Sequence, residues 1–314
     1  IRYEVENGKK FILMRRSQTQ AALIEKPEFS PVKPVFDDLG LSYKIEKIST
    51  QNSAIFIDPA NSRGSVDTVY MTGSVPFCYT AALSTFSNLR GFDASDVDHL
   101  IFDEFIPQKQ ERPIKAEAEA FFNCYETINR NRELQGREPL KAVLLANSFD
   151  VASPIFTYLK IVRRAERMLK TGQEIFVDKI RGFALVIPRQ SPISRQKSDT
   201  ALYRLVGQNS EYAEMALENT FKDNDFSDIR SVPLKEVVPV CEVGELCIYK
   251  HKAERIYYAT THRMGTFSDN FTWSDIDIAR FCQKYLILRK MYYQHRIFFD
   301  TYFSKALFDK IWKG

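Results

Sequence analysis

The sequence predicts an α/β protein with a mostly parallel sheet, followed by a smaller α/β unit. Short, uninterrupted apolar runs flanked by charged residues recur along the chain, as in strands that are buried on both faces of a parallel sheet. Segments with helical spacing of apolar residues separate these runs, and strands that alternate with helices indicate parallel pairing. The 314 residues also exceed the ~100–200 residues of a typical domain, so we expect two domains.

Four apolar runs are predicted to be buried strands of the first sheet: residues 10–16, 97–102, 140–147 and 183–188. Residues 53–58 and 68–72, joined by a loop with proline and glycine, have the pattern of a hairpin. Segment 115–134 repeats apolar residues at helical spacing and predicts an amphipathic helix. A further helix is expected to begin after Ser153, because serine suits an N-cap and a proline follows it.

The second half of the chain has a different character. Residues 190–232 are mostly polar and are predicted to be a lid or linker. Three short strand patterns then follow at 237–240, 246–249 and 256–261. Ser274 precedes two acids and predicts the start of a helix. Residues 280–314 carry eight Lys and Arg against two Asp, a basic surface that suits phosphates or acidic partners, while their aromatic residues are expected in the core.

Composition excludes several classes of protein. Hydrophobic residues make up 44% and charged residues 27%, which excludes a disordered or low-complexity chain. The net charge of +4 neither requires nor excludes a polyanionic partner. Five cysteines without CxxC spacing predict neither a zinc site nor a disulfide framework and favour a reducing compartment. No stretch approaches the ~18–20 apolar residues of a membrane span, so we expect no membrane partner.

Two acids follow a predicted buried strand and are the strongest chemical signal. In nucleotide-hydrolysing sheets the carboxyl ends of the strands face the ligand, so Asp103 is a candidate to hold Mg²⁺ through its water shell and Glu104 to act as general base. The alternative is that these acids simply begin a loop. Asn147 closes another predicted strand, either as a γ-phosphate sensor or as a turn residue. Arg130 either complements a solvated helix end or serves as an arginine finger for a neighbouring subunit.

The sequence blocks LIFDEFI (100–106), NRNRE (129–133), LLAN (144–147) and EYAEMAL (211–217) follow one another, and 11–16 and 286–290 fit the same pattern. In this order they resemble the DNA encapsidation proteins of small Bacillus-type podoviruses, which are genome-packaging ATPases similar to terminase large subunits. The resemblance implies a P-loop-type (ASCE) ATPase core in residues 1–189, a lid or linker in 190–232 and a small RNase H-like domain in 233–314. It also implies a homo-oligomeric ring, with five subunits expected, that uses ATP and Mg²⁺ to drive double-stranded DNA into a procapsid. Its expected partners are the phage portal and a packaging RNA, in the host cytoplasm during virion assembly.

Position by position, the resemblance assigns roles to six residues: Asp103 and Glu104 as the Walker B pair, Arg130 as a trans-acting arginine finger, Asn147 as phosphate sensor, Arg15 as a nucleotide contact at the subunit interface and Lys109 as a DNA contact in the channel.

Two departures from the family pattern matter. No GxxxxGK[ST] motif occurs, and the family's phosphate loop would fall before Ile1. We therefore expect missing N-terminal sequence, an inactive polypeptide as given and an active complete protein. The expected first strand of the C-terminal domain, residues 246–250, presents no carboxylate, so we expect a vestigial nuclease. Two alternatives stay open: a terminase-like nuclease acting through that domain, and a non-catalytic DNA-binding or scaffold protein.

Overall fold

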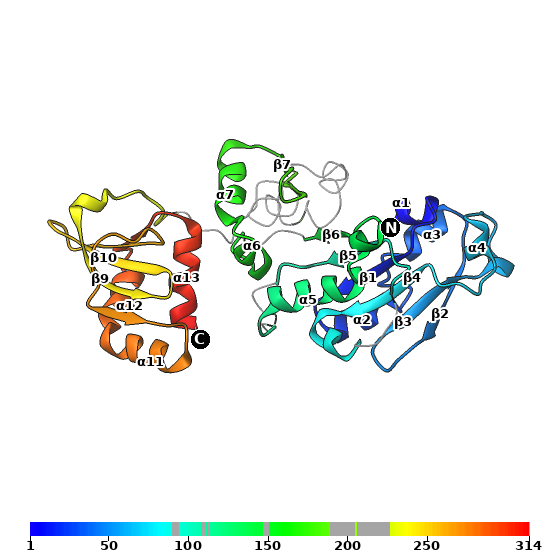
Figure 1. The fold of residues 1–314 in the computed structure, drawn as a ribbon, viewed down its shortest axis with the longest axis horizontal. Helices are drawn as coiled ribbons and strands as arrows, with labels where there is room; N and C mark the ends of the chain where they lie inside the picture. Colours follow the sequence, from blue (N-terminus) through cyan, green and yellow to red (C-terminus); the bar gives the residue numbers. More distant parts are fainter. Residues whose placement is uncertain are drawn as a thin grey trace. The chain divides into compact units, whose positions relative to one another are not determined.

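The computed structural model describes residues 1–89, 94–107, 111, 114–146, 151–188, 205 and 227–313 (Figure 1). The chain divides into two compact units, Ile1–Asn147 and Ser148–Gly314, which we call unit 1 and unit 2. The three domain ranges expected from the sequence stay predictions. Nearly all of the expected lid or linker, including the block 211–217, lies outside the described residues. Among the described helices, none combines the length and apolar character needed to span a bilayer.

Unit 1 is built on a six-stranded sheet with the strand order β2-β3-β4-β1-β5-β6. Its strands have these bounds: β1 Phe11–Arg15, β2 Tyr43–Lys47, β3 Ser53–Ile57, β4 Cys78–Ala82, β5 His99–Asp103 and β6 Lys141–Leu145. Strands β4, β1, β5 and β6 pair in parallel, whereas β3 pairs antiparallel with β4, and β2 with β3. The expected α/β class with a mostly parallel sheet is therefore confirmed for unit 1.

Helices and 3-10 turns connect these strands: α1 Arg2–Glu6, α2 Gln18–Ile24, α3 Lys33–Asp38, η1 Pro59–Asn61, α4 Thr68–Met71, η2 Leu83–Leu89, α5 Glu117–Asn129 and η3 Arg132–Gln135. Ser17 and Gln20 form a capping box at the start of α2, which fixes how the chain leaves β1. The predicted amphipathic helix in segment 115–134 is α5.

The central strands β1 and β5 are covered on both faces. On one face, Phe11 and Leu13 of β1 join a buried cluster with Ile24 of α2. On the other face, the rings of Phe102 in β5 and Phe121 in α5 stack with 5.5 Å between their centroids, and Figure 1 shows α5 alongside β5. Each such buried side chain contributes ~1.5–3 kcal/mol. This packing holds the carboxyl ends of β1 and β5 in fixed positions.

Two predictions for unit 1 are wrong. Residues 68–72 were expected in a hairpin strand, but Thr68–Met71 form α4, because the Asp67 carboxylate accepts a hydrogen bond from the Val69 N–H (3.0 Å) and caps the helix. The hairpin instead joins β2 to β3. Strand β6 was expected to be buried, yet it lies at the edge of the described sheet and its Leu145 is exposed. An apolar run does not reveal which strand is last in a sheet.

Unit 2 contains a two-stranded hairpin and a five-stranded sheet. Its elements are α6 Pro154–Tyr158, α7 Val162–Thr171, β7 Ile175–Asp178, β8 Phe183–Val186, η4 Leu234–Glu236, β9 Val237–Val243, β10 Leu246–His251, β11 Tyr257–Thr260, β12 Asp269–Phe271, α11 Asp275–Lys284, α12 Leu286–Tyr293, β13 Ile297–Phe299 and α13 Tyr302–Lys313. The larger sheet has the order β12-β9-β10-β11-β13, with β9, β10 and β11 antiparallel and both outer strands parallel to their neighbours.

The prediction of a buried strand at 183–188 in the first sheet is wrong. Strand β8 pairs antiparallel with β7 in a separate hairpin of unit 2, and of its residues only Leu185 is buried. The predicted helix starts are confirmed: the Ser153 and Ser274 hydroxyls accept hydrogen bonds from the N–H groups of Phe156 (3.4 Å) and Asp277 (3.3 Å). The RNase H-like identity of this unit stays a prediction.

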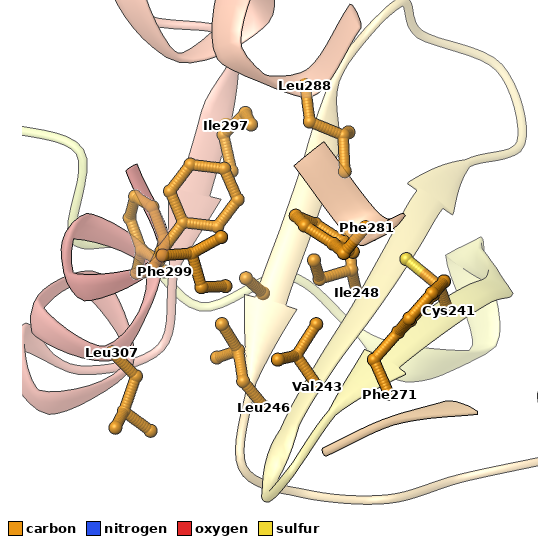
Figure 2. Packing of buried hydrophobic residues seen from close by; sticks show 13 residues of the cluster. Cys241, Val243, Leu246, Ile248, Phe271, Phe281, Leu288, Ile297, Phe299 and Leu307 are labelled. Atoms are coloured by element: carbon orange, nitrogen blue, oxygen red, sulfur yellow. The ribbon is translucent and has the colours of Figure 1, made fainter. Parts of the chain in front are cut away.

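The core of unit 2 lies between the five-stranded sheet and α11, α12 and α13. Side chains from β9, β10, β12 and β13 converge there on residues of the three helices (Figure 2). Phe281 and Leu288 are fully buried, and Tyr285 and Tyr292 pack against the same cluster. The expected core role of these aromatic residues is confirmed, although the helix is interrupted at Tyr285, between α11 and α12.

Candidate active site at the carboxyl ends of two parallel strands

The candidate site begins where β1 and β5 end side by side. The two strands pair in parallel, with Met14 opposite Phe102, so the next residues, Arg15 and Asp103, meet at one edge of the sheet. Their side chains project from the same face because paired residues of parallel strands share a face. Glu104 follows directly. Three charged residues are thus placed together by two apolar strands.

Arg15 bridges both acids. Its Nη2 lies 2.7 Å from Asp103 Oδ2, and its Nη1 lies 2.5 Å from Glu104 Oε2. The side chains of Arg15, Asp103 and Glu104 are 16%, 24% and 38% exposed. One guanidinium therefore pairs with two adjacent carboxylates and offsets one of their two negative charges in a partly dehydrated site. All three residues are expected at one site from the sequence, but their pairing is not.

The environment of Asp103 disfavours its charged form. Burial raises the pKa of the Asp103 carboxyl above its usual value, and repulsion from Glu104 adds to this, while attraction to Arg15 opposes it. Burial prevails. A carboxyl with a raised pKa is common at catalytic sites and also occurs in structural ion-pair networks.

Glu104 has an unusual backbone. Its φ of 57° lies in the left-handed region, which is uncommon for residues other than glycine. The following residue, Phe105, donates its N–H to the carbonyl of Leu145 in β6 (3.1 Å) and so holds the turn in place. Such a conformation costs ~1–2 kcal/mol, and it aims the Glu104 carboxylate back toward Arg15.

A second arginine behind the site was missed by sequence analysis. Arg16 is 2% exposed and binds Glu117 through two hydrogen bonds of 2.7 and 2.8 Å, and it also contacts Glu111. Gln20 donates a further bond to Glu111 (2.8 Å). Burial opposes the charge of Arg16, but the bonds to Glu117 and the nearby acids outweigh it and raise the pKa of Arg16. Successive residues of a strand point to opposite faces of the sheet. The adjacent arginines Arg15 and Arg16 were therefore a signal that Arg16 needs an acidic partner on the face covered by α5.

Arg130 is not brought to the acids of its own chain. It is exposed and caps α5 with a φ of 47°. Its neighbour Asn129 accepts a hydrogen bond from the N–H of Leu140, just before β6 begins (2.8 Å), and Arg132 donates to Ala94 and Ser95, which precede β5. Arg130 is thus near the amino ends of β5 and β6, whereas Asp103 is the last residue of β5, so the two lie toward opposite ends of these strands.

Two predicted site residues fall outside the described part of the chain: Asn147 and Lys109. Strand β6, which precedes Asn147, ends at Leu145 directly opposite Asp103. The roles of both residues stay predictions.

The residues fit one kind of metal site and not another. The described residues contain no group of three or more His, Cys, Asp or Glu placed to hold a metal by themselves. Mg²⁺ is commonly held by one or two carboxylates together with water and the phosphates of a nucleotide. Asp103 and Glu104 offer two such carboxylates, and both are paired with Arg15 in this structure. They are the residues that could hold Mg²⁺ together with water and phosphates.

The chain is similar to known proteins in sequence and in fold. The family model described as Podovirus DNA encapsidation protein (Gp16) matches residues 1–266. The bacteriophage Phi-29 viral genome packaging motor assembly contains a similar chain, with a TM-score of 0.66 and 18% identity over 99% of this chain and 88% of that chain. The Phi-28 gp11 DNA packaging motor is also similar, with a TM-score of 0.56 and 16% identity over 96% and 86% of the two chains. No curated protein sequence matches this chain. At these identities the solved structures show a shared fold.

Proposed function

This chain belongs to the podovirus DNA encapsidation protein (Gp16) family, whose function is phage DNA packaging, and from that premise we propose that it is a subunit of an ATP-driven ring that moves double-stranded DNA into a procapsid. The observation that carries the proposal is the cluster of Arg15, Asp103 and Glu104 at the carboxyl ends of two adjacent parallel strands. Ligands of open α/β sheets bind at this edge.

The proposed chemistry divides the work between the two acids. Asp103 would hold Mg²⁺ through water, and the ion would supply charge to the phosphates of ATP. Glu104 would orient the attacking water and accept its proton. Because Glu104 is paired with Arg15 in this structure, it must leave that contact before it can act as a base. Arg15, once released, is available as a nucleotide contact. No phosphate-loop motif occurs in the 314 residues, so this proposal concerns the carboxylate side of the site.

The position of Arg130 supports a site shared between subunits. Arg130 is exposed and lies at the opposite ends of the strands from Asp103, so within one chain it cannot reach the proposed nucleotide. An arginine finger at this position would act on the nucleotide of a neighbouring copy. This supports a homo-oligomeric ring, for which five subunits are the proposal. The portal, double-stranded DNA and a packaging RNA are the proposed partners.

The test is ATP hydrolysis by the protein with portal and DNA present. We expect Glu104→Gln and Arg130→Ala each to lower turnover by ~10³-fold or more, as in other phosphoryl-transfer sites that lose a catalytic group. Arg137→Ala is the matched control, because Arg137 is an exposed arginine that follows the same helix and donates to the Ser95 carbonyl. Normal turnover by Glu104→Gln would refute the assignment.

Mixed assemblies separate a cis from a trans role for Arg130. Rings that combine Glu104→Gln subunits with Arg130→Ala subunits should retain some turnover, because an intact Arg130 and an intact Glu104 then meet at some interfaces. If such rings behave like rings in which every subunit carries both substitutions, Arg130 does not serve its neighbour.

No observation favours the nuclease alternative. Within the described part of unit 2, Asp269 is bound by Lys284 (2.6 and 2.7 Å) and Tyr285 (2.5 Å). Asp277 accepts bonds from Thr272 and Arg280. These acids stabilise the start of α11 and its junction with β12. The scaffold alternative is decided by the ATPase test.

A further inference from the structure

A cationic surface lies outside the candidate active site, in unit 2. It is formed by α7 and the β7–β8 hairpin, which adjoin each other in Figure 1. Five residues make up what we call the basic hairpin surface: Arg164, Arg167, Lys170, Lys179 and Arg181. Arg164 is half-buried, and the other four are exposed. A sixth cation, Arg163, is engaged by Asp300 and Thr261 and is not counted.

Two of these arginines are held in place by aromatic rings. The guanidinium carbon of Arg164 lies 4.1 Å from the ring centroid of Phe176, and that of Arg181 lies 4.9 Å from the centroid of Phe183. The two rings contact each other with 6.2 Å between centroids. Arg181 also donates from Nη2 to the carbonyl of Leu159 (2.9 Å). Stacking leaves the remaining edge N–H groups of a guanidinium available as donors while it restricts the side chain. These two arginine side chains are therefore already restricted before a ligand binds, so binding costs less side-chain conformational entropy.

Acids in the same segment do little to neutralise this surface. Residues 162–182 contain six Lys and Arg against three Asp and Glu. Glu166 is buried and accepts a hydrogen bond from the N–H of Phe303 at the start of α13 (3.2 Å). Asp178 accepts bonds from the N–H groups of Ile180 (3.1 Å) and Arg181 (2.9 Å) within the hairpin turn. Two of the three acids thus satisfy backbone donors, although Glu166 also attracts Lys170. The five cations of the surface outnumber the three acids.

We propose that the basic hairpin surface binds the phosphodiester backbone of a double-stranded nucleic acid. Arg164, Arg167 and Lys170 follow at intervals of three residues, so they fall within ~120° of the circumference of α7 and extend over ~9 Å of its axis. A duplex presents one charge every ~1.7 Å of its axis, so several phosphates lie within reach of such a row. Protein interfaces exclude charges from their centres, whereas nucleic-acid interfaces concentrate cations, which favours the nucleic acid.

The inference rests on the proposed function only for its choice of ligand, and it can be tested without ATP. The probe is a fluorescein-labelled 30-base-pair duplex DNA, with a duplex RNA of the same sequence as a second arm, titrated with the full chain at 50–200 mM salt. Anisotropy gives the affinity, and the slope of its logarithm against the logarithm of salt gives the number of phosphates contacted. Equal affinity for both duplexes identifies shared backbone recognition, and a preference identifies the natural ligand.

The decisive variant is Arg164→Gln/Arg167→Gln/Arg181→Gln. Loss of three phosphate contacts should reduce the salt slope by ~2.7, at ~0.9 per contact. The matched control, Lys33→Gln/Lys44→Gln/Lys47→Gln, removes the same charge from exposed lysines of unit 1 that pair with acids. The control should leave the slope unchanged. An unchanged slope in the first variant, or an equal fall in both, overturns the inference.

A milder variant guards against misfolding. Arg167→Gln/Lys179→Gln leaves both arginine–aromatic stacks intact and should still lower the slope by ~1.8. A slope that does not fall in this variant also overturns the inference. Failure of the proposed function has a different signature: Glu104→Gln would hydrolyse ATP normally while duplex binding still depended on the basic hairpin surface.

Discussion

Replacement of Arg16 by methionine is expected to destabilise unit 1 by ~3–5 kcal/mol, the usual cost of leaving one member of a buried ion pair without its partner. Methionine fills much of the space of the arginine stem but cannot pair with Glu117. That carboxylate is 4% exposed, so little water can replace the lost guanidinium. The contact with Glu111 adds less, since its side chain is 21% exposed and keeps its bond from Gln20.

A double-mutant cycle tests the cause. Arg16→Met/Glu117→Leu removes both charges and should recover most of the loss, because two apolar side chains can replace a buried ion pair at little net cost. A remainder of ~0.3–1 kcal/mol is expected because Glu117 is the first residue of α5 and favours its dipole. Arg15→Met is the matched control and should cost less than Arg16→Met, because Asp103 and Glu104 are more exposed than Glu117.

Urea denaturation can be followed with two probes that separate the units. Both tryptophans, Trp273 and Trp312, lie in unit 2, so tryptophan fluorescence reports unit 2 alone, whereas far-UV circular dichroism reports both units. Arg16→Met should shift the circular dichroism transition and leave the fluorescence midpoint in place. A loss below ~1 kcal/mol, or a double variant no more stable than the single one, would refute the reasoning.

Three further predictions follow from burial. Phe299→Ala, in the fully buried core of unit 2, should cost ~3–5 kcal/mol and move the tryptophan transition, which Arg16→Met leaves in place; an unmoved tryptophan transition would contradict the described core. The raised pKa of Asp103, due first to burial and then to Glu104, means that the folded state binds its proton more tightly than the unfolded state. The pKa of this carboxyl is about 3.8 in the unfolded chain and higher in the folded protein. As pH rises from the first pKa through the second, the stability of the wild type should therefore fall relative to that of Asp103→Asn. A stability difference between the two proteins that is constant between pH 4 and 7 would contradict this. Cys282 should react first with a thiol reagent, because the other four cysteines are buried; simultaneous reaction of all five in the folded protein, counted by mass spectrometry, would contradict the fold.

The sequence was sufficient for several features whose signal is local, although it missed the local cap by which Asp67 starts α4. Apolar runs identified β1 and β5 because strands buried on both faces need apolar residues throughout, and Ser153 and Ser274 identified helix starts because a hydroxyl caps the N–H groups that follow it. The acids after β5 were recognised for the same reason, since a charged pair that ends an apolar run is visible without any partner.

Tertiary structure decided what depends on distant neighbours. Arg15 and Asp103 are 88 residues apart, and Arg16 and Glu117 are 101 apart, so their pairing follows from the strand order and the position of α5. The exposure of β6 and the separate β7–β8 hairpin likewise depend on which strands lie side by side. The chain itself specifies which residues prefer a strand, a cap or water. Which residues become neighbours is decided only when the whole core packs. The free energy of burial depends on contacts between segments that are far apart in the sequence.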